Sequence, residues 1–219
     1  MYANSRSIQS AQETPHERLA EIVQRHRDHA FQRPIAAHAR QAFERLKAHW
    51  HPSQPLVLDA GCGVGASSLQ LAKAMPEAFV VGVDQSGHRL GRGKEGPLPG
   101  NLLLLRTDLV DFWRLMAHEG VHLHRHYLLY PNPWPKIGQV QRRWHAHPVF
   151  PFLLQLGGVL ECRSNWKVYV EELAVAIAVL RGIHPAVERF EAGAPLTPFE
   201  RKYRDSGQEL YRLQVELDV

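Results

Sequence analysis

The sequence predicts an α/β protein in which helices cover both faces of a doubly wound, mostly parallel sheet. Three observations lead to this prediction. Short apolar segments alternate five times with segments of helical periodicity after residue 56, a glycine-rich turn follows the first apolar segment, and an aspartate ends each of the first three. With 219 residues and 44% hydrophobic composition, the chain is long enough to bury one core.

The expected elements follow in order. Helical spacing of apolar residues at 15–50 indicates two helices, the second opened by Pro34, so we expect an N-terminal extension (1–50) packed on the main domain (51–219). Strands are expected at LVLDA (56–60), AFVVGVD (78–84), NLLLLRTD (101–108), RHYLLY (125–130) and GVLECRS (158–164). Helices are expected at 65–75, 109–120, 145–156 and 166–182, and β-structure is expected at 186–192 and 208–219.

The composition narrows the class of protein. Lys and Arg number 26 against 22 Asp and Glu, and the net charge of +4 is compatible with a nucleic-acid partner without requiring one. Cys62 and Cys162 form no CxxC, so neither a disulfide framework nor a zinc cluster is expected. The N-terminal segment lacks the apolar core of a signal peptide, and no apolar run approaches the roughly 20 residues that span a bilayer. We therefore expect a soluble, cytoplasmic protein.

The glycine-rich turn lies at the carboxyl end of the first expected strand, in VLDAGCGVG. Gly61, Gly63 and Gly65 follow Asp59 there, and glycines at alternate positions let a ligand approach the backbone. The spacing is GxGxG, which differs from the GxGxxG of dinucleotide-binding folds, and the lack of GK[ST] excludes a P-loop.

Two further aspartates end the next two strands. A carboxylate at Asp84 would accept hydrogen bonds from ribose hydroxyls, and Asp108 lies where an adenine edge would bind. The alternative is that each aspartate only caps the following helix. Three acids after three consecutive strands, together with the glycines, favour a ligand site.

A rigid turn follows the fourth strand in PNPWPK, residues 131–136. Three prolines fix the backbone and remove donors, so neither a helix nor an interior strand continues through it. Asn132, Trp134 and Lys136 stand between the prolines, and we interpret them as lining a pocket for a flat, polar ring.

The glycine turn and the strand-end acids, over about residues 56–180, resemble the class I S-adenosylmethionine-dependent methyltransferases, whose fold is Rossmann-like. The resemblance implies that the three glycines line the methionine part of the cofactor, that Asp84 holds its ribose and that Asp108 holds its adenine. Asp59 and Asn132 complete the cofactor residues that it implies. No metal is expected: His122, His124 and His126 alternate, but they lie at the beginning of a strand, away from its carboxyl end.

Three later motifs resemble the bacterial tRNA (guanine-N7)-methyltransferases. PNPWPKIGQVQRR, SNWKVYVEEL and TPFERKYRDSG occur in the order of that family's PDPWPK with a basic run, TDW, and T-x-F-E before a closing strand, which we expect to be antiparallel. The implied catalytic residues are Asn132, Lys136 and Asn165. The implied substrate residues are Trp134, Lys136, Arg142, Arg143, Asn165, Trp166, Thr197, Phe199 and Glu200. Asn132 and Asn165 depart from the family pattern, which has acids at both positions.

The resemblance implies methyl transfer to N7 of a guanine in tRNA. This nitrogen carries an in-plane lone pair and no proton, so alignment and electrostatics suffice for catalysis. With asparagine at the two acid positions, Glu200 is the acid that could read the Watson–Crick edge. One alternative is an amino-methyltransferase with [ND]PP[WY], although Pro135 and Trp134 are exchanged here relative to that motif. Another is a non-catalytic RNA-binding relative.

Several charged residues have a structural as well as a functional interpretation. We expect the basic stretch with Arg142, Arg143, His145 and His147 to contact phosphate rather than form a solvated loop. For the other basic residues and two glutamates, a solvated face is the simpler interpretation: Arg25, His26, Arg27, His29, Arg33, Glu171 and Glu172.

Overall fold

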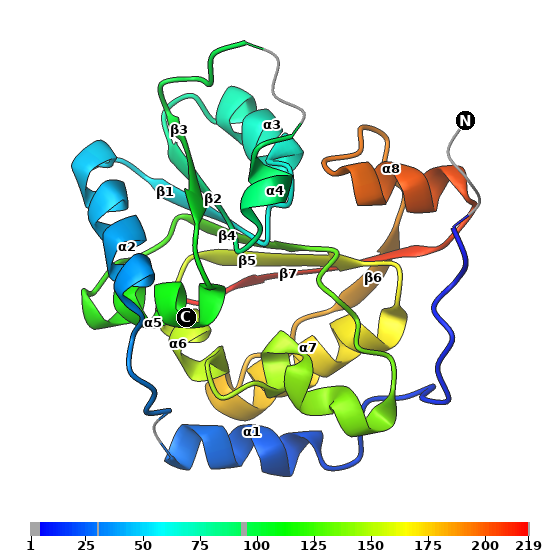
Figure 1. Ribbon diagram of the computed structural model, residues 1–219. Coiled ribbons are helices and arrows are strands. Elements are labelled where there is room, and N and C mark those ends of the chain that lie inside the picture. The colour runs from blue at the N-terminus through cyan, green and yellow to red at the C-terminus, as the bar shows by residue number, and fades with distance from the viewer. Residues whose placement is uncertain (1–4, 30, 93–95, 219) are drawn as a thin grey trace.

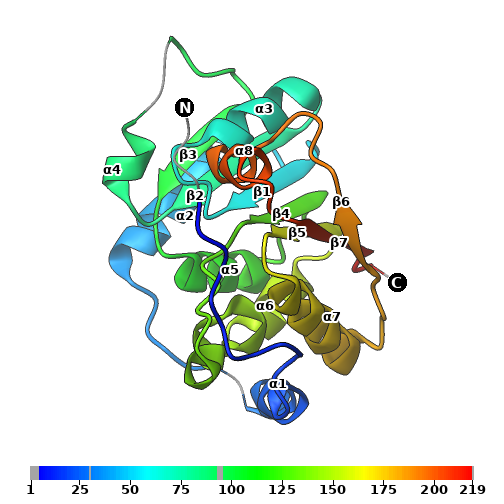
Figure 2. The ribbon, with the colours of Figure 1, turned by 90° about the vertical axis from the view of Figure 1, so that its right-hand side faces the viewer.

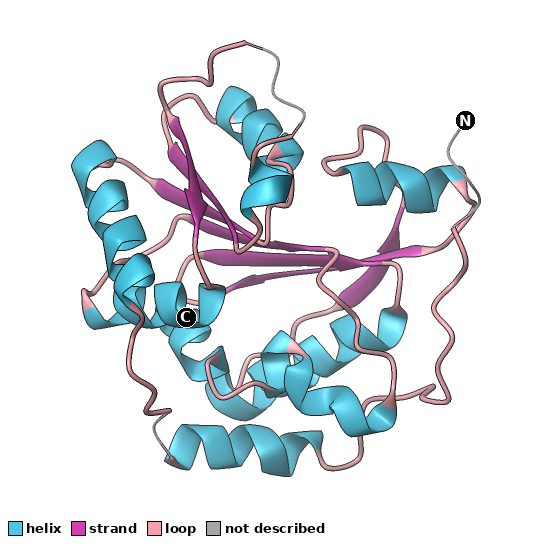
Figure 3. Cartoon of the chain, in the orientation of Figure 1, coloured by secondary structure: helices cyan, strands magenta, loops and turns pink. Residues whose placement is uncertain are grey.

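A seven-stranded sheet forms the centre of the protein (Figures 1 and 3). The computed structural model describes residues 5–29, 31–92 and 96–218. The strand order is β3-β2-β1-β4-β5-β7-β6, the first five strands are parallel, and β7 runs antiparallel to β5 and β6. The predicted doubly wound sheet with an antiparallel closing strand is confirmed.

The strands and helices have the following bounds. The strands are β1 (Leu56–Ala60), β2 (Phe79–Asp84), β3 (Leu102–Arg106), β4 (Arg125–Leu129), β5 (Val159–Ser164), β6 (Val187–Phe190) and β7 (Leu210–Glu216). The α-helices are α1 (Leu19–Asp28), α2 (Ala37–His49), α3 (Ala66–Ala74), α4 (Gly87–Leu90), α5 (Leu109–His118), α6 (Phe150–Gln155), α7 (Lys167–Arg181) and α8 (Pro198–Asp205). Two 3₁₀ helices are η1 (Ile137–Arg142) and η2 (Trp144–Ala146).

Both faces of the sheet are covered because its central strands are apolar on both sides. Along β1, Leu56 and Leu58 pack into a large core with α1, α2, α5, α6 and α7, whereas Val57 packs into a smaller core with α3. Figures 1 and 2 show α3, α4 and α8 on one side of the sheet and α1, α5, α6 and α7 on the other. Helices α1 and α2 therefore belong to the same core as the strands.

The helix expected at 145–156 is wrong as one element. Pro148 interrupts it, since proline has no N–H and clashes with the preceding turn. Residues 144–146 form only the short η2, and α6 begins at Phe150, with Pro151 in its first turn, where a missing donor costs nothing. Helices α4 and α8 were not expected from the sequence.

The N-terminal segment takes a long path over the surface. In Figure 1 it starts beside α8, descends past the sheet and enters α1 at the bottom of the view. It thereby passes the carboxyl ends of β4 and β5 before the first helix begins. Among the described helices, none is long and apolar enough to cross a membrane.

Candidate active site

A cavity of about 720 Å³ lies at the carboxyl ends of the parallel strands. Its walls come from the glycine turn after β1, the ends of β2 and β3, the loop after β4 and the start of α8. The expected site residues that line it are Asp59, Gly61, Gly63, Asp84, Asp108, Asn132, Trp134, Arg142, Thr197 and Phe199. One space thus joins the expected cofactor residues to part of the expected substrate residues.

The glycine turn leaves room for a ligand beside the backbone. Gly61 and Gly63 have φ angles of +80° and +61°, and no atom outside the adjoining residues lies within 4 Å of the point where a Cβ would stand. Gly65 has a different role, because it is the left-handed N-cap of α3 and a Cβ there would lie 2.9 Å from Leu104 Cδ1. The first two glycines therefore form the open part of the turn.

Asp59 holds the turn and α3 together. It is 1% exposed, and its Oδ2 accepts hydrogen bonds from the hydroxyls of Ser67 and Ser68, each at 2.6 Å. Burial raises the pKa of Asp59, and these hydrogen bonds oppose the rise. Because the carboxylate is already hydrogen-bonded to α3, its main effect is to fix the position of the glycine turn.

Asp84, which the sequence predicts to be a ribose acceptor, has protein partners in the structure. Its Oδ2 accepts from the Gly63 N–H at 3.0 Å, its Oδ1 accepts from the Ser86 N–H at 2.8 Å, and Arg89 Nη2 lies 3.1 Å from Oδ1. A carboxylate has about four lone-pair directions, so it retains capacity for a ligand hydroxyl. Asp84 both ties β2 to the glycine turn and faces the cavity.

Asp108 combines the two roles weighed for it from the sequence. Its side chain caps α5 by accepting from the Val110 N–H at 2.9 Å, and it also lines the cavity. Arg33 approaches it at 3.2 Å and pairs with buried Asp111 at 2.7 Å, while its side chain stays 43% exposed, as expected of a solvated residue. Thr107 Oγ1 is buried at the cavity without a hydrogen-bond partner, which leaves it available to a ligand.

The loop after β4 is strained. Tyr130 (φ +53°) and Trp134 (φ +46°) are the two non-glycine residues with positive φ in the described part of the chain, and each such conformation costs about 1–3 kcal/mol. A buried charged side chain hydrogen-bonds to each of these two residues. The Tyr130 hydroxyl donates to Glu200 at 3.0 Å, and the Trp134 carbonyl accepts from Arg143 Nη2 at 3.0 Å and Nε at 3.3 Å. Strain maintained in this way is common at functional sites.

The exposed face of this loop presents polar and cationic groups to the cavity. Asn132 is exposed, and its Oδ1 accepts weakly from the Trp134 N–H at 3.4 Å. The Arg142 guanidinium stacks over the Trp134 ring, 4.8 Å from its centroid. Lys136 is exposed beyond the residues that line the cavity. Asn132, Trp134 and Arg142 are therefore grouped at one wall.

Arg143 does not contact solvent, and the expected phosphate contact is wrong for it. Its side chain is fully buried, pairs with Glu172 Oε2 at 2.5 Å and stacks on Trp166, 4.8 Å from the ring centroid. Glu172 is equally buried, which corrects its expected place on the helix surface. Burial would raise the pKa of Glu172, but hydrogen bonds and charges from His145 and Arg143 lower it to about 2. Trp166 is 8% exposed and lies behind the cavity wall.

Glu200 is also buried, and it cannot read a base edge in this arrangement. It has no exposed surface, and it accepts from Arg163 Nη1 at 2.9 Å, the Tyr130 hydroxyl at 3.0 Å and the Leu196 N–H at 2.6 Å. Thr197 caps α8 by accepting from the Glu200 N–H at 2.9 Å.

The remaining residues expected from the T-x-F-E and TDW patterns lie apart from one another. Phe199 is 49% exposed and lines the cavity beside Thr197. Asn165 is outside the cavity lining, and its Nδ2 donates to Gln208 Oε1 at 2.8 Å. The structure therefore brings Asn132 to the cavity and places Asn165 behind it.

Burial lowers the pKa of three histidines in these segments, His126, His145 and His147. Burial lowers the pKa of His147 to about 4, and neighbouring cations contribute. Burial also lowers the pKa of His145 and lowers that of His126 to about 3. His122 and His124 line a separate cavity at the opposite end of the strands. No group of three or more potential metal ligands occurs among the described residues.

Some cavity residues were not identified from the sequence. They are Thr107, Arg89, Arg92, Tyr130 and Trp144. Thr107 and Tyr130 directly follow the residues at which β3 and β4 end, so the rule that identified Asp84 and Asp108 could have identified them. Arg89, Arg92 and Trp144 lie further along the chain, and they reach the cavity only because of how their segments fold.

Comparisons with known proteins identify relatives of the chain. A family model described as "Putative methyltransferase" matches residues 53–213. The tRNA (guanine-N7)-methyltransferase of Acinetobacter baylyi is 30% identical over 183 residues, covering 75% of this chain and 71% of that protein. The protein of the same name from Pseudomonas aeruginosa is 30% identical over 173 residues, covering 74% and 70%.

Solved structures share the fold at low identity. An antibiotic-related methyltransferase has a TM-score of 0.57 at 12% identity, with 84% of this chain and 96% of that chain covered. The aminoglycoside resistance methyltransferase NpmB1 has a TM-score of 0.53 at 21% identity, covering 78% and 91%.

Proposed function

The chain belongs to the tRNA (guanine-N7)-methyltransferase family, and we propose that it transfers a methyl group from S-adenosylmethionine to N7 of a guanine in tRNA. One observation carries the proposal beyond family membership. The open glycine turn, Asp84 at the end of β2, Asp108 two residues after β3, and the Asn-Pro-Trp loop all line a single cavity.

The residues at the cofactor end fit S-adenosylmethionine. Gly61 and Gly63 give free access to the backbone, as the methionine part requires. Asp84 offers carboxylate oxygens to ribose hydroxyls. The Thr107 hydroxyl, which has no hydrogen-bond partner, lines the cavity together with the adjoining Asp108. Bound S-adenosylmethionine supplies a methyl group on a sulfonium, which is already electrophilic.

The substrate end aligns a base rather than activating it. Guanine N7 has an available lone pair and no proton to remove, so no general base is required. Trp134, stacked under Arg142, provides a flat wall, and Asn132 offers a neutral donor and acceptor. Arg142 and Lys136 are exposed cations near this wall and are suited to contact the RNA backbone.

A second candidate is methyl transfer to an exocyclic base amine. The observation that favours it is that the substrate end of the cavity, among the described residues that line it, has no carboxylate. An amide oxygen at Asn132 can accept from an amine, whereas a cationic N7-methyl product gains no counter-charge from it.

The deciding experiment identifies the product. Purified protein is incubated with labelled S-adenosylmethionine and total tRNA, and the digested nucleosides are analysed by mass spectrometry. We expect 7-methylguanosine. A nucleoside methylated on an exocyclic amine would support the second candidate. Cofactor binding without any methylated nucleoside would contradict both.

A further inference from the structure

The N-terminal segment 5–18, here called the strap, lies against the back of the substrate end of the cavity. The Ser5 N–H donates to Ser206 Oγ at 3.1 Å, and Gln208 Nε2 donates to the Ser5 carbonyl at 2.8 Å. Five residues later, Ser10 Oγ donates to the Pro135 carbonyl at 2.7 Å. The strap precedes residue 53, at which the family match begins, so these contacts come from a part of the chain that the match does not include.

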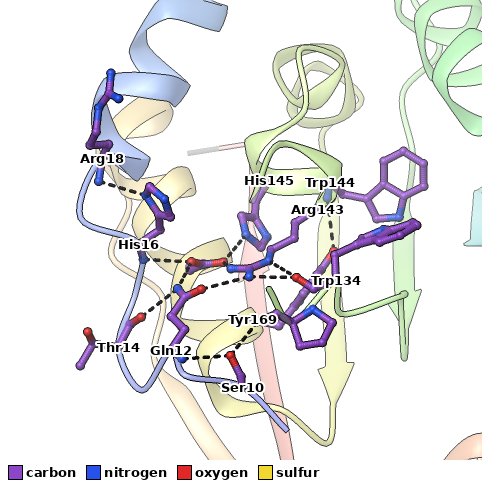
Figure 4. Close-up of polar contacts among 12 residues, drawn as sticks. Ser10, Gln12, Thr14, His16, Arg18, Trp134, Arg143, Trp144, His145 and Tyr169 are labelled. Carbon is purple, nitrogen blue, oxygen red and sulfur yellow. Dashed lines mark hydrogen bonds and ion pairs between the residues drawn. The ribbon is translucent and has the colours of Figure 1, made fainter. Parts of the chain in front are cut away.

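Gln12 is the most deeply placed polar side chain of the strap. It is 8% exposed, and its Nε2 donates to Glu172 Oε1 at 2.6 Å while its Oε1 accepts from Arg143 Nη2 at 3.0 Å (Figure 4). The side-chain amide thus joins both members of a buried ion pair. It can do so because an amide is a donor at one end and an acceptor at the other.

The Arg143–Glu172 ion pair connects Gln12 to the strained loop. Arg143 donates to the Trp134 carbonyl through Nε and Nη2, and Glu172 fixes Arg143 from α7. Glu172 also accepts from the His16 N–H at 2.9 Å and from His145 Nε2 at 2.8 Å. The strap therefore supplies two of the donors that surround this carboxylate. Without the strap, Arg143 and Glu172 would have fewer hydrogen-bond partners, and they would hold the positive φ of Trp134 less firmly.

A second connection leads from the strap to the other asparagine that departs from the family pattern. Asn165 donates to Gln208 Oε1, and the amide nitrogen of Gln208 donates to Ser5. The loop that carries Asn132 and the turn that carries Asn165 are thus both tied to the strap. Hydrogen bonds 125 to 203 residues apart in sequence make these connections.

We propose that the strap braces the substrate end of the cavity and that Gln12 is a positioning residue for methyl transfer. Gln12 acts through Arg143 on the carbonyl of Trp134, and so on the wall against which the target base lies. The inference rests on the proposed methyl transfer. It places no part of the strap in contact with the cofactor.

The test compares Gln12→Ala with Gln9→Ala in the full chain, because Gln9 is an exposed glutamine on the same strap. We measure kcat and KM for tRNA, S-adenosylmethionine affinity by calorimetry, and the thermal unfolding midpoint. For Gln12→Ala, kcat should fall about 10- to 100-fold, since small displacements of a positioned group have effects of this size. The cofactor Kd should stay within about twofold of wild type, because the glycine turn and Asp84 are untouched. Gln9→Ala should match wild type throughout.

If Gln12 had only a structural role, its substitution would lower kcat and cofactor affinity together. Equal losses in both would therefore overturn the proposal. So would a kcat for Gln12→Ala equal to that of Gln9→Ala. If no wild-type methylation is detected, the proposed function itself has failed. Ser10→Ala, which removes one hydrogen bond to Pro135, provides a milder variant should Gln12→Ala not fold, and a kcat unchanged in it would then refute the brace.

Gln12→Glu adds a readout that depends on pH. The introduced carboxyl group would face Glu172, Arg143, His145 and the His16 backbone. When protonated it can donate to Glu172 as the amide does, and when ionised it repels that carboxylate. The kcat of this variant relative to wild type should therefore rise as the pH falls through the pKa of the introduced carboxyl group, which is measured by titration of the variant. A ratio that stays constant through that pKa would contradict the role assigned to the Gln12 donor.

Discussion

Replacing Glu200 by glutamine tests whether this buried carboxylate stabilises the fold or binds the target base. The sequence suggested that Glu200 reads the base, whereas the structure buries it between Arg163, Tyr130 and the Leu196 N–H. Removing one member of a buried ion pair costs about 3–5 kcal/mol when the other is left unpaired. Arg163 keeps Glu161 at 2.6 Å and retains 13% side-chain exposure. We therefore expect a loss of about 2–3 kcal/mol in the free energy of unfolding.

Urea unfolding followed by circular dichroism measures this loss. Glu191→Gln is the matched control, because Glu191 is an exposed glutamate on the segment before α8, and it should change stability by less than about 0.5 kcal/mol. If Glu200→Gln unfolds like wild type while kcat/KM for tRNA collapses, the buried role is wrong. Glu200 would then reach the substrate after a rearrangement of α8.

Three further predictions concern charge. Asp84→Ala should weaken S-adenosylmethionine binding by about 1–3 kcal/mol in calorimetry, and an unchanged affinity in a folded variant would exclude Asp84 as a ligand. Neutralising Lys136 or Arg142 should each lower the salt slope of tRNA binding by about one unit, and unchanged slopes would place the RNA elsewhere. Asn132→Asp should be tolerated or raise kcat/KM if the target is guanine N7, and should impair transfer to an exocyclic amine; the methylated product and the rate decide.

The pH dependence of stability provides the last prediction. The pKa of Glu172 is lowered from 4.5 to about 2 in the folded protein, so its stabilising contribution is complete above pH 4.5 and is lost as the pH falls towards 2. The loss should be roughly 3 kcal/mol in acid unfolding, and Glu172→Gln should remove it. A variant that retains the same acid transition would show that other carboxylates cause it.

The parts of the fold that the sequence predicted are those with local signals. The apolar runs of β1 to β5 gave the parallel sheet, and the rule that sites follow strand ends led to Asp84 and Asp108. A local signal for α8 was also present. Thr197, Pro198 and Glu200 have the spacing of a helix N-terminus, with a capping threonine, a proline at the first position and a glutamate at the third.

The buried charges could not be predicted in the same way, because they depend on contacts between distant segments. Gln12 and Glu172 are 160 residues apart, and nothing near Arg143 in the sequence indicates its burial. Glu172 did have a partial signal: it follows Val168 by four residues and precedes Ala176 by four, both on the buried face of α7. A glutamate in phase with a buried face indicates a buried partner, and the structure shows that the partner is Arg143.

The two glutamates most closely associated with the substrate end are therefore unavailable to the reacting base. Glu200 neutralises the partly buried Arg163, and Glu172 neutralises the buried Arg143. Each arginine–glutamate pair supports one of the two strained residues of the loop, Tyr130 or Trp134. Negative charge that could balance a cationic product serves instead to hold the loop in shape. Because Asn132 replaces the acid of the family pattern, the wall formed by Asn132, Trp134 and Arg142 carries no negative charge. Catalysis at this site must then depend on alignment of the base more than on a counter-charge. The rate therefore depends on the geometry of the loop and on the strap that supports it.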